Sequence, residues 1–406
     1  MNGLSSSERA LMECASAVPM LDQVQKWAAV NSGSRNLVGL ATIADLLADA
    51  FSLLPGEIQL VAPEDVESVS PAGHVELVGH GQHLLLSVRP NAARRLLLTG
   101  HMDTVFPADH AFQTIRWVDG DTLNGPGVAD MKGGLAVMLA ALQALESSKH
   151  FADVGYDVVI NSDEELGSPS SAGLLRNAAK GKLAAFTYEP ALPDGTLAGA
   201  RSGSGNFSVV VTGRTAHAGR NPEAGRNALL AAADLALRLK AGSGAGLTCN
   251  PARIDGGSPN NVVPDKAILY VNFRPRTAEA ERYAQQLISR SVEDVSRDHD
   301  VTMTVHGGFG RPPKPIDDKA MRLFTLVRQS GSDLGLQIDW RDTGGVCDGN
   351  NIAACGVPVV DTMGVRGGAI HSDEEYLIVE SLAERAQLSA LTLLRIAQGK
   401  LQGGLA

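Results

Sequence analysis

Five short segments carry acidic and histidine side chains in patterns that suit the binding of cations. In chain order they contain His101 and Asp103, Asp130, Glu164 and Glu165, Glu189, and His371. In an extended segment His101 and Asp103 point to the same side, so His101 can ligate a metal while Asp103 accepts its other ring N–H. A carboxylate such as Asp130, in a glycine-rich loop before a helix, can bridge two cations. This mixture of imidazole and carboxylate groups suits Zn²⁺ or a similar divalent ion.

Each segment taken alone has an ordinary structural explanation. A His-x-Asp pair is more often a surface or helix-capping pair, and two adjacent glutamates usually lie on a solvated loop. An aspartate among glycines, or a glutamate before proline, is more often a turn residue. The joint occurrence of five segments, four of them at predicted strand ends, is what favours a metal site.

An α/β sheet must position these segments. Helical spacing of apolar residues predicts helices over 37–53, 135–148 and 321–330 and a last helix from Ser381, whereas short apolar runs predict buried strands at 94–100, from 156 into a polar loop at 165, and at 357–363. This alternation predicts an α/β sheet with helices on both faces. The acids and histidines follow the strands, at the edge where open α/β sheets bind ligands.

The middle of the chain has a different pattern. A strand from Asn206, a helix from Asn227, strands at 248–254 and 266–275, a helix at 278–299 and a strand from Val301 give the order βαββαβ, which is ferredoxin-like. A chain of 406 residues is also too long for one ordinary core. We therefore expect residues 1–201 and 312–406 to form one domain, and residues 202–311 to form a second domain inserted into it.

Composition excludes several classes of protein. With 35 Lys and Arg against 45 Asp and Glu, the net charge of −10 argues against a nucleic-acid partner. We expect no membrane partner, since we find no apolar run of the ~18–20 residues that a membrane helix needs. The N-terminus has no basic start followed by an apolar core, and none of the four cysteines is spaced as Cys-x-x-Cys. These features predict a cytoplasmic protein without a structural zinc knuckle.

The ordered motifs HMDTV, NGPGVADMKGG, NSDEELGS, YEP and HSDEE resemble those of the di-zinc aminoacylase/carboxypeptidase family, over nearly the whole chain. The family includes glutamate carboxypeptidases of the folate-cleaving kind, acetylornithine deacetylase and succinyl-diaminopimelate desuccinylase. The resemblance implies a zinc-peptidase-like catalytic domain with a mixed sheet flanked by helices. It also implies that the ferredoxin-like insertion is a lid through which a homodimer forms.

The resemblance further implies two Zn²⁺ ions, although Co²⁺ or Mn²⁺ could occupy the same sites. One ion would be held by His101, Asp130 and Glu189, and the other by Asp130, Glu165 and His371. Asp130 would bridge them and would be followed by a cis peptide bond.

Two further acids would serve the reaction. Asp103 would orient His101, and Glu164 would be the general base that takes a proton from a water shared by the two ions. The resulting hydroxide would attack an amide carbonyl, and Glu164 would return the proton to the leaving amine.

Two of the candidate residues in the inserted segment are a histidine and an asparagine. His217, in the run Thr-Ala-His-Ala-Gly, matches a family histidine that reaches the active site of the partner subunit and donates to the oxyanion. Asn261, in GSPNNVVP, matches a family residue that holds the substrate carboxylate. Without the zinc motifs, His217 would be read as a loop histidine with no role.

Four more residues match family positions around the substrate. Arg274 in NFRP and Arg311 in GFGRP match arginines of the glutamate carboxypeptidases, and arginine is well suited to a carboxylate. Gly345 and Cys347 lie in a run that matches a pocket loop, where Cys347 replaces the commoner Ser or Thr. A catalytic cysteine is an unfavoured alternative because it would need an activating base. No Gly-x-Ser-x-Gly, Walker or Gly-x-Gly-x-x-Gly run supports another enzyme class.

The leading hypothesis is a di-zinc hydrolase that removes a C-terminal amino acid, glutamate or a similar acid, from an N-acyl or peptide substrate. The alternative is an N-acyl-amino-acid deacylase of the acetylornithine deacetylase or succinyl-diaminopimelate desuccinylase type. A third hypothesis is a non-catalytic binding protein with the same fold. It is disfavoured because Glu164 and every expected ligand position are filled.

Overall fold

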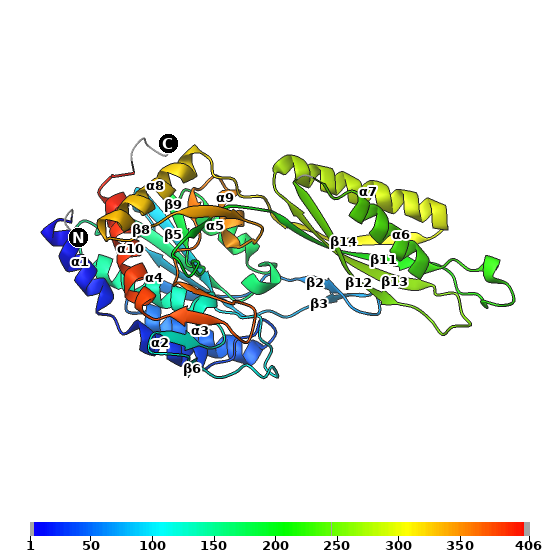
Figure 1. Cartoon of the computed structure of the whole chain (residues 1–406), viewed down its shortest axis with the longest axis horizontal. Helices are drawn as coiled ribbons and strands as arrows, with labels where there is room; N and C mark the ends of the chain where they lie inside the picture. Colours follow the sequence, from blue (N-terminus) through cyan, green and yellow to red (C-terminus); the bar gives the residue numbers. More distant parts are fainter. Residues whose placement is uncertain (1–3, 245, 402–406) are drawn as a thin grey trace.

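A six-stranded mixed sheet forms the centre of the larger part of the molecule (Figure 1), in a computed structural model that describes residues 4–244 and 246–401. The strands follow the order β1 (Glu57–Val61), β4 (His83–Val88), β8 (Val154–Asn161), β5 (Arg94–His101), β9 (Ala184–Thr187) and β16 (Val359–Val360). β5 runs parallel to both β8 and β9, while β4 is antiparallel to β1 and β8. The carboxyl ends of β8, β5 and β9 therefore meet at one edge of the sheet.

Helices cover both faces of this sheet, as predicted. Because side chains alternate along a strand, Leu96 and Leu98 of β5 face one apolar cluster and Leu97 faces the other. The first face is covered by α1 (Ser6–Ser16), α2 (Met20–Ala28), α3 (Leu37–Phe51), α4 (Gly134–Glu146), α8 (Asp318–Asp333) and α10 (Glu380–Ala397). The second face is covered by α5 (Ala172–Ala179) and α9 (Asp348–Ala353).

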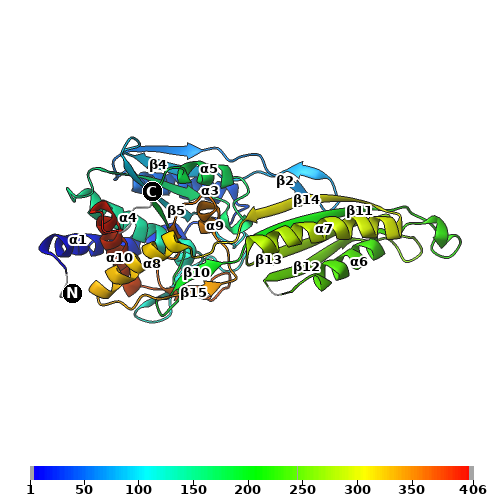
Figure 2. The same cartoon turned by 90° about the horizontal axis from the view of Figure 1, so that it is seen from above.

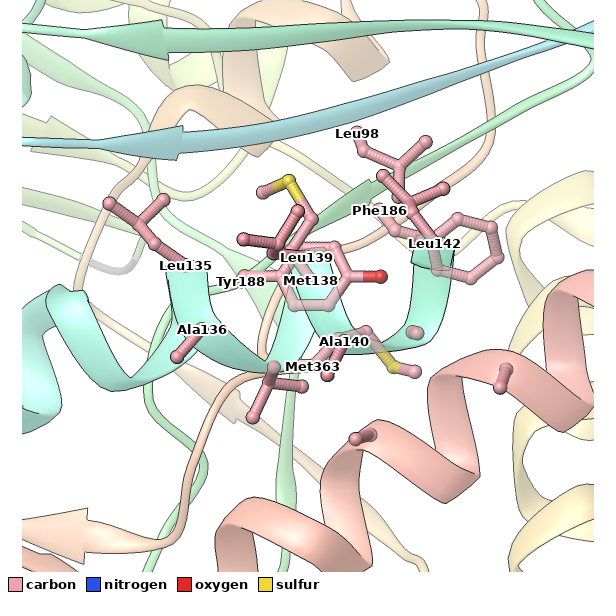
Figure 3. Close-up of a cluster of buried hydrophobic side chains, with 14 of the residues drawn as sticks. Leu98, Leu135, Ala136, Met138, Leu139, Ala140, Leu142, Phe186, Tyr188 and Met363 are labelled. Carbon is pink, nitrogen blue, oxygen red and sulfur yellow. The ribbon is translucent and has the colours of Figure 1, made fainter. Parts of the chain in front are cut away.

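Helix α4 is the centre of the larger core. Figure 3 shows Leu142 of this helix beside the strand residues Leu98 and Phe186, in a buried cluster that also contains Leu135 and Met138. Within the described residues one segment, Val128–Glu146, is long and apolar enough to cross a membrane, and nearly all of it is buried in the fold. The expectation that no apolar run has this length is therefore wrong. A helix that is apolar all round can also be the interior of a large domain, as it is here.

A second, four-stranded antiparallel sheet lies beside the first part (Figures 1 and 2). Along the chain its elements are β11 (Ser204–Thr212), α6 (Ala228–Ala241), β12 (Leu247–Gly256), β13 (Lys266–Pro275), α7 (Ala278–His299) and β14 (Thr302–Arg311), in the order βαββαβ. The sheet order is β12-β13-β11-β14. The side chains of Asn227 and Thr277 accept hydrogen bonds from the first turns of α6 and α7, which explains where both helices begin. Both helices pack on one face of the sheet through residues such as Leu235 and Ile288.

Several small elements were not predicted. A hairpin of β2 (Glu67–Val69) and β3 (Val75–Leu77) lies between the two parts (Figure 1). Two small sheets lie beside the main one: β17 (Gly367–Gly368), β18 (Tyr376–Ile378), β7 (Thr122–Asn124) and β6 (Arg116–Trp117), and the pair β10 (Leu197–Arg201) and β15 (Trp340–Thr343). The predicted strand over 357–363 is too long, because only Val359 and Val360 pair with β9 at the edge of the sheet.

Candidate metal centre and substrate cavity

The predicted acids and histidines meet at the carboxyl edge of the main sheet. His101 is the last residue of β5, Glu164 and Glu165 form a short 3₁₀ turn after β8, and Glu189 follows β9. His101 and Asp103 are buried, as are Glu164 and Glu189. The parallel arrangement of these strands brings together residues that are far apart in the sequence.

His101 is surrounded by carboxylates. Its Nε2 lies 3.1 Å from Oδ1 of Asp130 and 3.8 Å from Oε2 of Glu189, while its Nδ1 lies 3.0 Å from the backbone oxygen of Asp103 and 3.4 Å from the Asp103 Oδ1. The hydrogen bonds that Asp103 accepts come instead from the hydroxyl of Ser34 and from the backbone N–H groups of Glu164 and Glu165. Asp103 therefore fixes the turn that carries both glutamates, and it also lies beside His101.

Asp130 lies between the two histidines. Its Oδ2 is 3.3 Å from Nε2 of His371, which is also 3.2 Å from Oε2 of Glu165. Asp130 belongs to the buried turn Val128–Gly133, and the peptide bond to Met131 is cis, as the resemblance implies. His371 follows β17 in a left-handed conformation with φ of 64°, and 52% of its side chain is exposed. One carboxylate thus contacts an imidazole on each side.

These groups fit a divalent cation. Two overlapping sets offer ligand atoms within 4.8 Å of one another: His101, Asp130 and Glu165, and His101, Glu164 and Glu189. Among the described residues, Oε1 of Glu189 is buried without a hydrogen-bond partner. Unpaired buried carboxylate oxygens are costly unless a cation approaches them. The donor set is that of a site for zinc or a similar ion.

The charges of the metal-free protein agree with this interpretation. Burial raises the pKa of Glu164 to about 7, and burial together with the charge of Asp130 raises the pKa of Glu165 to about 8. Burial works against ionisation of Asp130, but His101 and His371 hold the pKa of its carboxyl well below the usual range. Hydrogen bonds to Asp130 and Glu165 raise the pKa of His371 to about 11. A bound cation would take the place of the protons that this site holds at neutral pH.

A cavity of about 1210 Å³ opens over these groups and is lined by both parts of the molecule. Asp130, Glu165 and His371 line it from the main part, and Arg274, Phe309 and Arg311 line it from the second sheet. The other predicted residues on its wall are Glu164, Glu189, Gly345 and Cys347.

The two predicted arginines are placed differently. The Nη2 of Arg311, which is buried, lies 2.8 Å from Oε1 of Glu164 and donates to the Glu164 backbone oxygen and to Ser168; Asp348 Oδ1 lies 3.3 Å away. Arg274 is half-buried and donates its Nε to the side chain of Asn272. No ion pair to Arg274 occurs within residues 4–244 and 246–401. Arg274 is therefore the freer of these two arginines.

His217 and Asn261 do not reach this cavity. Both side chains are exposed, and the two residues lie in neighbouring loop segments, joined by a hydrogen bond from the N–H of Ala218 to the oxygen of Asn261. Neither residue lines the cavity of this chain.

Cys347 is a buried helix cap. Its sulfur accepts from the N–H of Gly349 at the start of α9, and burial raises the pKa of the thiol well above its ordinary value. Both features disfavour a thiolate nucleophile.

Several polar residues near the cavity were missed from the sequence. The Oδ2 of Asp361 forms ion pairs with Nε of Arg201 and with Nζ of Lys314, each at 2.8 Å. Asp348 contacts Arg311 and accepts from Ser168 and Asn161. Of these, Asp348 lies in the run GGVCDGN, which matches the family's pocket loop, and this match could have identified it as a residue near the cavity. Glu375 is the last residue of the matched run HSDEE, but it was given no role from the sequence.

Comparison with known proteins agrees with this geometry. Residues 97–395 match the model of peptidase family M20/M25/M40. Carboxypeptidase G2 from Pseudomonas sp. (strain RS-16) is 31% identical over 331 residues, which cover 79% of this chain and 78% of that protein. A succinyl-diaminopimelate desuccinylase from Herminiimonas arsenicoxydans is 27% identical over 357 residues, which cover 79% and 91%. The crystal structure of the M20 family metallo-carboxypeptidase Sso-CP2 from Sulfolobus solfataricus matches with a TM-score of 0.70 at 15% identity, over 94% of this chain and 100% of that one. The family resemblance is confirmed: the chain belongs to peptidase family M20/M25/M40 and is a hydrolase of the metallopeptidase and amidohydrolase type.

Proposed function

We propose that this enzyme releases a C-terminal amino acid, glutamate or a similar acid, from an N-acyl or peptide substrate. The observation that carries the proposal is the position of Arg274 on the wall of the cavity that holds the histidines and carboxylates. Its guanidinium is half-buried and has no carboxylate partner among the described residues, so it is free to bind the carboxylate of a substrate. The similarity to a carboxypeptidase G2 supports the same substrate class.

We propose two divalent cations, zinc in the first place and Co²⁺ or Mn²⁺ as alternatives. His101, Asp130 and Glu189 would hold one, and Asp130, Glu165 and His371 would hold the other. The unpaired oxygen of Glu189 and the position of Asp130 between two imidazoles support this assignment. When bound, the cations would supply Lewis acidity to the scissile carbonyl and to the attacking water.

The chain's own residues would move the proton. Glu164 would take it from the attacking water and deliver it to the leaving amine. The Asp103 carboxylate supports this role because it accepts the backbone N–H of Glu164 and so fixes the base. Arg311, 2.8 Å from the Glu164 Oε1, would hold that carboxylate in place and would join Arg274 in attracting an acidic substrate.

The second candidate is an N-acyl-amino-acid deacylase of the acetylornithine deacetylase or succinyl-diaminopimelate desuccinylase type. The desuccinylase relative, of which 91% is covered, favours it. Both reactions hydrolyse an amide, and they differ in which half of the substrate fills the cavity. We would load the protein with zinc, measure its metal content, and assay N-acyl-glutamates, folate analogues and acetylated basic amino acids. Cleavage of acetylornithine without cleavage of any acyl-glutamate would reject the carboxypeptidase proposal.

We also propose that residues 202–311 form a lid and a homodimer contact. Leu230 and Leu237 of α6 are exposed apolar side chains, with 60% and 71% of their surface accessible. His217 and Asn261 are exposed and lie away from the chain's own cavity. A second copy docked through this domain would cover the leucines and would give both polar residues access to the neighbouring cavity.

A further inference from the structure

Glu375 is a buried carboxylate that binds the backbone of the turn carrying Asp130. Its Oε2 accepts the N–H of Gly127, and its Oε1 accepts the N–H groups of Ala129 and Asp130, each at 3.0 Å. Only 1% of the surface of Glu375 is exposed, and its carboxylate forms no ion pair within the described part of the chain. Three backbone donors therefore take the place of solvent and of a cationic side chain.

The backbone of Glu375 is fixed as well. Its carbonyl oxygen accepts from the side chain of Asn124 at 2.7 Å and from the N–H of Gly125 at 3.2 Å. The next residue, Tyr376, pairs with Asn124 in the ladder of β18 and β7. Side chain and main chain of one residue thus tie the segment 124–130 to the segment 371–376.

This link joins two of the groups that would hold cations. Glu375 lies four residues after His371, and it does not line the cavity. Its effect passes through the N–H of Asp130, whose Oδ2 lies 3.3 Å from the His371 Nε2. We propose that Glu375 is a positioning residue, which holds Asp130 opposite His371 and thereby sets the affinity for the cation between them. This inference rests on the proposed metal site.

A carboxylate is required because all three partners are donors. In Glu375→Gln the amide oxygen could still accept the hydrogen bonds from the N–H groups of Ala129 and Asp130. The NH₂ group would then face the N–H of Gly127, and two donors cannot bond to each other. Reversing the amide would set its NH₂ against two N–H donors. Either arrangement leaves at least one buried backbone donor unpaired and shifts the turn.

Glu374→Gln is the matched control. Glu374 is the neighbouring residue, its side chain is exposed, and the substitution removes the same charge. We would titrate metal-free wild type, Glu375→Gln and Glu374→Gln with Zn²⁺ against a chromophoric chelator. The absorption spectrum of the Co²⁺-loaded proteins and the thermal unfolding of the metal-free proteins would be recorded beside it.

We expect wild type and Glu374→Gln to bind zinc alike, and Glu375→Gln to bind it about 10–100-fold more weakly with an altered Co²⁺ spectrum, as loss of a ligand-supporting contact does elsewhere. Wild-type affinity in Glu375→Gln would overturn the inference, even if its Tm fell, because the residue would then serve folding alone. If Glu375→Gln does not fold, Glu375→Asp keeps the charge on a shorter side chain and should show a smaller loss; unchanged affinity would again overturn the inference. Wild type that binds no zinc would instead reject the proposed function itself.

Discussion

Replacing Arg274 by methionine tests the proposed substrate class most directly. Methionine keeps the apolar stem on β13 and removes only the guanidinium. In the structure the Nε of Arg274 is already used by Asn272, which leaves the two terminal amino groups for a substrate carboxylate. Hydrogen bonds to charged groups contribute about 1.5–3 kcal/mol each, and we take the lower value because Arg274 is only half-buried. Two such bonds give about 3 kcal/mol, or roughly a 100-fold loss in kcat/KM.

The assay compares an N-acyl-glutamate with its two monoamides in zinc-loaded protein. Arg274→Met should lose about 100-fold on the diacid and on the amide that keeps the recognised carboxylate, and far less on the amide that lacks it. Arg341→Met is the control, because Arg341 also lines the cavity but is exposed on β15. An equal loss on all three substrates, or the same loss in Arg341→Met, would refute the reasoning, since the effect would then be one of folding or of general charge.

Three other predictions address the chemistry and the assembly. Glu164→Gln should keep its zinc content and lose activity by several orders of magnitude; turnover near that of wild type would remove Glu164 from the role of base. Inactive His217→Ala mixed with inactive Glu164→Gln should regain some activity in mixed dimers, and no recovery despite proven subunit exchange would argue against a site completed by the partner. Because the pKa of His371 is raised to about 11 and that of Glu165 to about 8, zinc must displace protons at pH 7. Zinc affinity should therefore rise between pH 6 and 8, and a binding enthalpy that is the same in buffers of different ionisation heat would contradict this.

The elements with strong local signals are those that the sequence predicts well. The strand over Lys266–Pro275 and the helix over Ala278–His299 match the prediction at both ends. The alternation of the strand and the apolar spacing of the helix are local patterns, and the Thr277 cap directly precedes the helix. The hairpin of β2 and β3 has no such pattern. Its strands have three residues each, and Val75 and Leu77 are exposed.

The same distinction applies to the candidate site. His101 and Glu164 were identifiable because His101 ends the buried strand β5 and Glu164 comes three residues after the buried strand β8. The contacts of Glu375 join positions about 245 residues apart, so no local pattern could indicate them. The ion pair of Arg311 with Glu164 spans 147 positions and depends on how the second sheet lies against the first.

The position of the second sheet in turn depends on α9. The chain passes between the two parts of the molecule twice, near Ser202 and near Pro312, and the amide of Asn350 donates to the carbonyl oxygens of both, at 2.9 and 2.7 Å. The two crossings also pair with each other, since Arg201 and Lys314 exchange backbone hydrogen bonds.

Two residues before Asn350, Asp348 contacts Arg311, whose guanidinium lies against Glu164. One short helix therefore fixes both crossings and the arginine that meets the proposed base. Arg274, on the strand before the second crossing, is carried by the same sheet. Substrate recognition by Arg274 and proton transfer by Glu164 would thus be kept in register by α9, although neither residue belongs to it.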